Sequence, residues 1–157
     1  LVNVNQSLEG LVRRFFEPEV RSWFLFDDTL SALSSLKDQD FNLGVVSNAR
    51  SHWAVLEIMR RLKIDRFFGT IVTSARLGLR KPRPEIYLKA MRDLGSDPGS
   101  TIMVGNSLET DVIGAKRLKT RTLYLEREMS GHRIVEPDAT IKSLSEIPRV
   151  VREWIRP

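Results

Sequence analysis

The sequence predicts an α/β fold in which mostly parallel strands form a sheet with helices on both faces. Short apolar runs rich in β-branched residues alternate along the chain with segments whose apolar residues recur at helical spacing. Such continuous apolar strands are typical of parallel sheets, whose crossover helices cover both faces. Because these sheets bind ligands at the carboxyl ends of their strands, the residues after each strand are the first candidates for a functional site.

The first forty residues differ from the rest of the chain. Apolar residues at helical spacing predict an amphipathic helix that ends at Pro18 (Leu8, Leu11, Val12, Phe15 and Phe16). Residues 23–26 are apolar and ambiguous between types of secondary structure. A second helix, with Asp28 as its N-cap, is predicted from Leu30, Leu33 and Leu36.

From residue 41 onward, strands and helices alternate. The predicted strands cover residues 41–46, 70–73, 101–104, 122–125 and, as a short fifth, 138–141. Helices are predicted between them over residues 55–62, 84–94 and 112–116, the second with Pro84 in its first turn. Residues 143–146 form a capping-box sequence that opens a last helix with Val150, Val151 and Trp154 facing inward.

Composition indicates one globular domain and excludes several kinds of site. The chain has 157 residues, 41% hydrophobic and 29% charged, close to the average for soluble domains. No run approaches the roughly 20 apolar residues of a membrane-spanning helix, so we expect no membrane association. Cysteine is absent and there are two histidines, which excludes disulfides, thiolate chemistry and cysteine- or histidine-rich metal centres. The lack of cysteine fits a reducing, cytoplasmic setting.

The net charge of +5 raises the question of a nucleic-acid partner. However, the 25 basic residues are interspersed with 20 acidic ones, and no basic run marks a tail or stripe. We interpret the charge as an ordinary solvated surface and do not expect a nucleic-acid partner. A basic scaffold on RNA stays as a hypothesis that requires binding to weaken steeply with salt.

Polar residues follow three of the predicted strands. Ser47 and Asn48 end the first, where a hydroxyl can donate to an anionic oxygen. Lys81 precedes a helix, and its neighbouring prolines predict an extended segment over residues 80–84. Asn106 follows the third strand, and Asp111 falls in the first turn of the next helix. Each has a structural alternative: a turn for Ser47-Asn48, a surface lysine beside a turn for Lys81, and a helix cap for Asp111. The functional interpretation is an anion site at this edge of the sheet.

In order and spacing, these segments resemble the haloacid dehalogenase superfamily of hydrolases, most of which are phosphatases. The resemblance covers about residues 20 to 157 and rests on three motifs and the chain's ending: Ser47-Asn48 after a strand, Gly78-x-x-Lys81-Pro82-x-Pro84-Glu85-Ile86, Val104-Gly105-Asn106-Ser107-x-x-x-Asp111-x-x-Gly114-Ala115, and Pro137-Asp138-Ala139 before the last helix. It implies a Rossmann-like, doubly wound parallel sheet, with residues 21–157 as the core domain and residues 1–20 as the end of a helical cap domain.

By the same resemblance, Ser47 and Lys81 are catalytic residues. Ser47, Asn48 and Lys81 are expected to bind the phosphate of a small phosphorylated substrate. Asn106 and Asp111 occupy the place of the family's acidic Mg²⁺-binding motif. The implied chemistry is phosphoryl transfer, in which positioning and charge neutralisation act on a spreading negative charge.

The sequence departs from the family pattern at two places. Asn106 stands where most members have an aspartate, so weaker Mg²⁺ binding is expected. The nucleophilic aspartate that forms an aspartyl-phosphate is also missing. Residues 25–30 are the nearest candidate, but that alignment puts Leu25 at the nucleophile position. We therefore favour Asp27 and Asp28 as caps of the following helix.

If so, the family's central strand is missing between the strand that ends at Ser47 and the strand before Asn106. Two apolar strand edges would then be unpaired. A substitute for this strand could come from residues 23–26, from an upstream polypeptide or from another chain. Two hypotheses follow: a Mg²⁺-dependent phosphatase whose nucleophile lies outside this chain, which alone is incomplete or inactive, and a non-catalytic module that binds a phosphorylated ligand or a protein.

Overall fold

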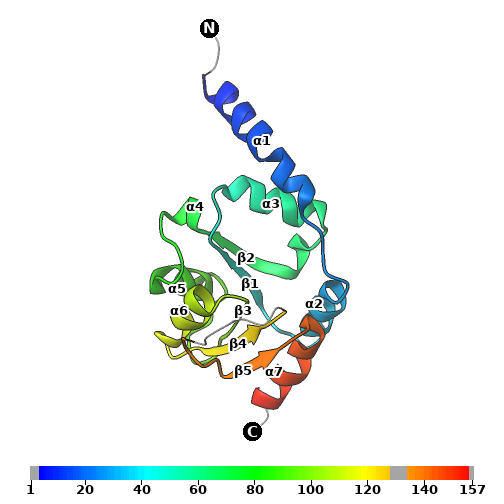
Figure 1. Cartoon of the computed structure of the whole chain (residues 1–157), viewed down its shortest axis with the longest axis vertical. Helices are drawn as coiled ribbons and strands as arrows, with labels where there is room; N and C mark the ends of the chain where they lie inside the picture. Colours follow the sequence, from blue (N-terminus) through cyan, green and yellow to red (C-terminus); the bar gives the residue numbers. More distant parts are fainter. Residues whose placement is uncertain (1–3, 128–133, 156–157) are drawn as a thin grey trace.

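The computed structural model describes residues 4–127 and 134–155. Its elements follow the predicted alternation of strands and helices (Figure 1). In chain order they are α1 (Val4–Ser22), α2 (Thr29–Lys37), β1 (Leu43–Ser47), α3 (His52–Arg61), η1 (Asp65–Phe67), β2 (Phe68–Thr73), α4 (Ser74–Leu77), α5 (Pro84–Asp93), β3 (Ile102–Gly105), η2 (Leu108–Val112), α6 (Ile113–Lys116), β4 (Arg121–Leu125), β5 (Ala139–Ile141), η3 (Leu144–Glu146) and α7 (Ile147–Ile155).

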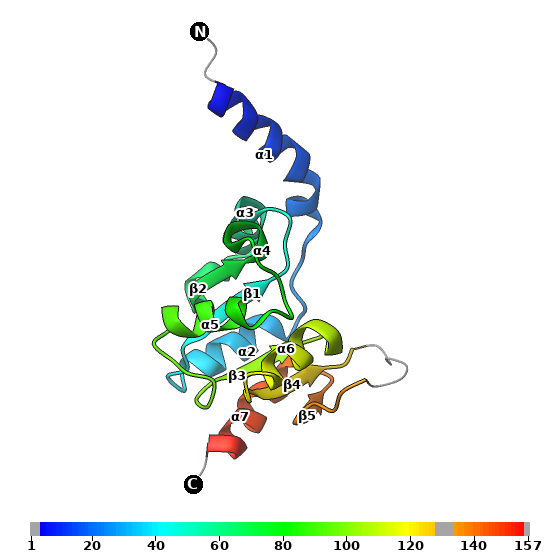
Figure 2. The ribbon, with the colours of Figure 1, turned by 90° about the vertical axis from the view of Figure 1, so that its left-hand side faces the viewer.

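The strands form two separate parallel sheets. One has the order β1-β2 and the other β3-β4-β5. In Figures 1 and 2 the sheets lie side by side, with β1 next to β3. All pairs are parallel, which confirms the predicted α/β class, and the carboxyl ends of the strands share one edge.

Helices cover the sheets on both faces. On one face, α5 packs through Ile86, Tyr87 and Met91 against apolar side chains of β1, β2 and β3. On the other face, α2 and α7 pack against β4 and β5, with partly buried side chains of β1 and β3 added to that cluster. These two layers join the sheets although no strand hydrogen bonds do so.

No strand of the described residues lies between β1 and β3. Within residues 4–127 and 134–155, no strand pairs with the inner edge of either. No residue of β1 or β3 is buried, whereas three consecutive residues of β4 are. Central strands of a covered sheet are normally its most buried. The predicted absence of the central strand is therefore confirmed for the described residues.

Residues 23–26 do not replace that strand. They connect α1 to α2 without strand structure, and Trp23, Phe24 and Phe26 expose about half or more of their surface (54%, 74% and 50%). The segment therefore leaves both inner edges open.

The prediction that Pro18 ends the first helix is wrong. Helix α1 continues through Pro18 to Ser22 and projects from the core (Figures 1 and 2). Proline removes one intrahelical hydrogen bond, which water replaces where a helix is exposed. The helical turn after Pro18 is stabilised by tertiary packing, because Val20 packs against Ala54 and Ile58 of α3.

Among the described helices, none combines the length and the apolar composition needed to cross a membrane.

Candidate active site

A buried ion pair lies at the carboxyl edge of the sheets. The Nζ of Lys81 is 2.6 Å from Oδ1 of Asp111, and the two side chains are only 12% and 5% exposed. Lys81 comes from the loop between α4 and α5, and Asp111 from η2, which follows β3. The structure thus pairs two residues that the sequence analysis assigns to the same edge of the sheet.

The side chain of Asn48 holds the backbone of Lys81. Its Oδ1 accepts a hydrogen bond from Lys81 N (2.8 Å), and its Nδ2 donates to Lys81 O (3.0 Å). Both polar ends of the amide are therefore engaged in positioning the lysine. The expected contact of Asn48 with phosphate stays a prediction.

The loop that carries Lys81 is not extended, as the sequence analysis expects, but a tight turn. Arg83 N donates to Arg80 O (3.0 Å), and the Lys81–Pro82 peptide bond is cis. The backbone contacts with Asn48 fold this loop against the end of β1. Sequence reasoning missed the turn because it depends on a residue 33 positions away.

Asp111 is positioned by the first turn of η2 and by Gly105. Its Oδ2 accepts a hydrogen bond from Ser107 N (3.1 Å), and the Ser107 hydroxyl in turn accepts one from Thr110 N. A Cβ on Gly105 would lie 2.2 Å from that carboxylate oxygen. The glycine that ends β3 therefore lets the carboxylate lie directly against the strand end.

A second glycine, Gly114 of α6, lets α5 pack closely against η2 and α6. The hydroxyl of Tyr87 donates to Thr110 O, and a Cβ on Gly114 would collide with that hydroxyl. Burial and the neighbouring Asp111 carboxylate raise the pKa of Tyr87, so its hydroxyl stays protonated as a donor.

Ser47 and Asn106 lie at the ends of β1 and β3, on either side of the missing strand. Within the described part of the chain, neither side chain has a hydrogen-bond partner, and Asn106 is exposed. A hydroxyl and an amide oxygen are therefore available for a ligand at this edge.

Among the residues that the structure describes, the donor set for Mg²⁺ is incomplete. Residues 4–127 and 134–155 contain no group of three histidine or acidic side chains able to hold a metal. Asp111 supplies one carboxylate, already paired with Lys81, and Asn106 supplies an amide oxygen. Mg²⁺ accepts such oxygens but needs more ligands, so these two residues fit only as part of a site.

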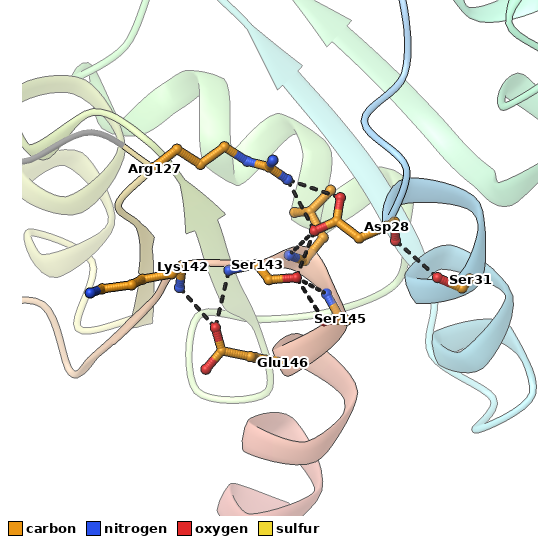
Figure 3. Close-up of polar contacts among 8 residues, drawn as sticks. Asp28, Ser31, Arg127, Lys142, Ser143, Ser145 and Glu146 are labelled. Atoms are coloured by element: carbon orange, nitrogen blue, oxygen red, sulfur yellow. Dashed lines mark hydrogen bonds and ion pairs between the residues drawn. The ribbon is translucent and has the colours of Figure 1, made fainter.

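Asp28 stands at the N-cap position of α2, but its side chain does not cap that helix. Instead, Figure 3 shows its carboxylate among groups from the carboxyl ends of β4 and β5. It accepts hydrogen bonds from Ser143 Oγ and Leu144 N, both 2.7 Å, and pairs with Arg127 at 2.9 Å. The guanidinium of Arg127 also lies 3.7 Å from the ring centroid of Phe26.

The capping role predicted for Asp28 is thus corrected. Its carboxylate caps η3, which is more than a hundred residues away in sequence, so no local signal could indicate the contact. Asp27 is exposed. Ser143 and Glu146 form the predicted capping box, which is confirmed.

Known proteins resemble this chain in sequence and structure. The family model described as haloacid dehalogenase-like hydrolase matches residues 2–125. Proteins named glyceraldehyde 3-phosphate phosphatase are 35% identical over 67% of the chain (Methanothermobacter thermautotrophicus) and 33% identical over 82% (Methanopyrus kandleri). The alignments cover 46% and 57% of those relatives, so the chain spans about half their length.

A solved structure shares the fold over most of this chain. The crystal structure of a HAD phosphatase from Thermococcus onnurineus superposes with a TM-score of 0.80 at 26% identity, covering 89% of this chain and 64% of that protein.

Proposed function

Because the chain belongs to the haloacid dehalogenase-like hydrolases, we propose that it forms the phosphate-binding part of a Mg²⁺-dependent phosphatase for a small phosphorylated substrate. The observation that carries this proposal is the buried Lys81–Asp111 pair, which Asn48 holds at the edge of the sheet where Ser47 ends β1. The phosphatase names of the relatives support the substrate class. The setting that we propose is the cytoplasm.

Each residue has a role set by its position. Ser47 donates a hydrogen bond to a phosphoryl oxygen, and the ammonium of Lys81 neutralises charge as it spreads over the phosphoryl group. Asn48 fixes the backbone that carries Lys81. Asn106 and Asp111 contribute oxygens to a Mg²⁺ that balances phosphate charge when bound.

In this proposal, the missing strand carries the nucleophile. A strand placed between β1 and β3 would pair with both open edges, and its carboxyl end would lie between Ser47 and Asn106. We propose that this strand comes from an upstream polypeptide or another chain and carries the aspartate that attacks phosphorus. In the same scheme, α1 is the end of a cap domain over residues 1–20.

A non-catalytic module is the second candidate. It is favoured by Asn106, which has an amide where most family members have a carboxylate, and by Leu25, which stands at the nucleophile position in the nearest match to the family's motif. Such a module would use the same Ser47 and Lys81 to hold a phosphorylated ligand without cleaving it.

Two measurements test the proposal. Titration calorimetry with inorganic phosphate or tungstate should show binding that Ser47→Ala weakens, with Ser34→Ala on α2 as a control at a distant serine. The 157-residue chain alone should not hydrolyse p-nitrophenyl phosphate, and supplying the strand with its aspartate should give Mg²⁺-dependent turnover. If the completed protein hydrolyses no phosphate ester in a broad screen, the non-catalytic candidate replaces the phosphatase.

A further inference from the structure

A small pocket lies at the amino ends of β4 and β5, at the opposite edge of the sheet from the candidate active site. Its volume is about 190 Å³. Arg121 begins β4, and Asp138 directly precedes β5. The end of α6 and the turn that follows it supply the other lining residues, Lys116, Lys119 and Thr120. Because β4 has five residues, the two edges are about 16 Å apart along this strand.

Thr120 has a buried hydroxyl without a hydrogen-bond partner. The residue is 2% exposed, and Oγ1 is the one buried side-chain oxygen or nitrogen of the described residues that makes no hydrogen bond. Its backbone N–H is bonded to Ala115 O (3.1 Å). Buried hydroxyls in native proteins normally have a partner, and one without a partner costs stability. Because Thr120 forms part of the pocket wall, a group bound in the pocket can supply that partner.

The lining of the pocket is cationic. Lys116 and Asp138 form an ion pair (2.9 Å) and neutralise each other. The other oxygen of Asp138 accepts hydrogen bonds from Thr122 N (2.8 Å) and Thr122 Oγ1 (2.7 Å), so both carboxylate oxygens are engaged within the protein. Lys119 and Arg121 then leave a net positive charge on the lining.

Both of these cations are positioned by local structure. Arg121 Nη1 donates to Trp154 O (2.7 Å), and the guanidinium lies 5.8 Å from the centroid of the Trp154 ring. That hydrogen bond uses one of five guanidinium N–H groups. Lys119 is exposed and has a left-handed backbone (φ 58°) in a turn where its N donates to Lys116 O (2.9 Å). An ammonium, a guanidinium and a hydroxyl therefore line one pocket.

We propose that this pocket binds a small tetrahedral oxyanion, either free phosphate or the phosphoryl group of a larger molecule. The Thr120 hydroxyl donates to one oxygen of the anion, and Lys119 and Arg121 balance its charge. Pockets for drug-sized ligands have volumes of about 300–1,000 Å³, so a pocket of about 190 Å³ suits a single anionic group. The site shares no residue with the candidate active site and does not rest on the proposed function.

Thr120→Val tests the hydroxyl through two opposite effects. Valine keeps the shape of the side chain but removes its polar group. Inorganic phosphate should therefore bind at least about fivefold more weakly, while the thermal midpoint of the free protein rises by about 2–4 °C. NMR shifts of the backbone amides of residues 119–121 measure the affinity at this pocket separately from phosphate bound at Ser47. Thr120→Ser, which keeps the hydroxyl, should bind phosphate as the unchanged chain does.

Lys119→Gln tests the charge and should weaken phosphate binding at least about threefold. Lys63→Gln is the matched control, because Lys63 is also exposed and has the same φ of 58° but lies outside the pocket. Glycerol 3-phosphate is titrated in parallel. Saturating shifts at residues 119–121 with either ligand support the site, and the tighter ligand shows whether the pocket prefers the free ion or an esterified phosphoryl group.

Three results would overturn the proposal. They are the lack of a saturating shift at residues 119–121 with either ligand, an equal loss of affinity in the Lys119 and Lys63 variants, and a Thr120→Val variant that binds phosphate unchanged or has a lower thermal midpoint. Ser47→Ala should leave the shifts at residues 119–121 unchanged, so this test and the test of the proposed function fail independently.

Discussion

Replacing Lys81 by methionine should destabilise the protein strongly. The change keeps most of the side-chain volume but leaves the Asp111 carboxylate, which is 5% exposed, with a single remaining hydrogen bond from Ser107 N. Breaking a buried ion pair by removing one partner costs about 3–5 kcal/mol. At about 2–4 °C per kcal/mol for a chain of this size, the thermal midpoint should fall by roughly 6–20 °C.

A double-mutant cycle isolates the pair. Unfolding in urea is followed for Lys81→Met, Asp111→Asn and the double variant. Asparagine removes the charge with little change in shape, so the double variant no longer buries an unpaired ion. We expect its loss of unfolding free energy to be smaller than the sum of the single losses by at least about 1 kcal/mol.

Lys89→Met is the matched control. Its ammonium also pairs with an aspartate at 2.5 Å, but the side chains of Lys89 and Asp93 are 42% and 30% exposed. Exposed pairs contribute about 0–1 kcal/mol. If Lys81→Met costs no more than Lys89→Met, or if the losses in the cycle simply add, the ion pair is not what stabilises this edge of the sheet.

Three further predictions concern the neighbouring residues. Asn106→Asp adds a carboxylate to the proposed Mg²⁺ site and should tighten Mg²⁺ binding in titration calorimetry. An unchanged affinity for Mg²⁺ would mean that Asn106 is not part of the site. Gly105→Ala should displace the Asp111 carboxylate and weaken phosphate binding, whereas Gly10→Ala, with open space around it, should not. Asp28 should stabilise the fold above about pH 4. Although burial opposes ionisation, hydrogen bonds from Ser143 and Leu144 and the charge of Arg127 lower its pKa, so this stability is lost as pH falls through the folded-state pKa. The difference in unfolding free energy between the wild type and Asp28→Asn, measured in urea, should shrink below pH 4; a constant difference would contradict the role of the Asp28 charge.

The order of strands and helices could be predicted from the sequence because its signals are local. Apolar periodicity, the prolines and the capping box of Ser143 and Glu146 each act within a few residues. The residues at the ends of β1 and β3 could be selected for the same reason, because strand ends of a parallel sheet share one edge. The lack of a central strand among the described residues was also predicted, because residues 25–30, the nearest match to the nucleophile motif, have Leu25 at the nucleophile position.

Only the tertiary structure decided which contacts those residues make. The sequence selects Lys81 as a phosphate-binding residue, but only the structure shows that its ion pair with Asp111, 30 positions away, is buried. Asn48, selected as a phosphate-binding residue, also holds the backbone of Lys81, and Asp28, predicted to cap its own helix, caps η3 instead. Such contacts form only where loops that are distant in sequence lie close together in the fold. The packing of α5 against the sheets, and of η2 against α5, brings these loops together. Composition and spacing name the chemical groups at this edge, whereas their burial, and with it the free energy of each contact, comes from the folded chain.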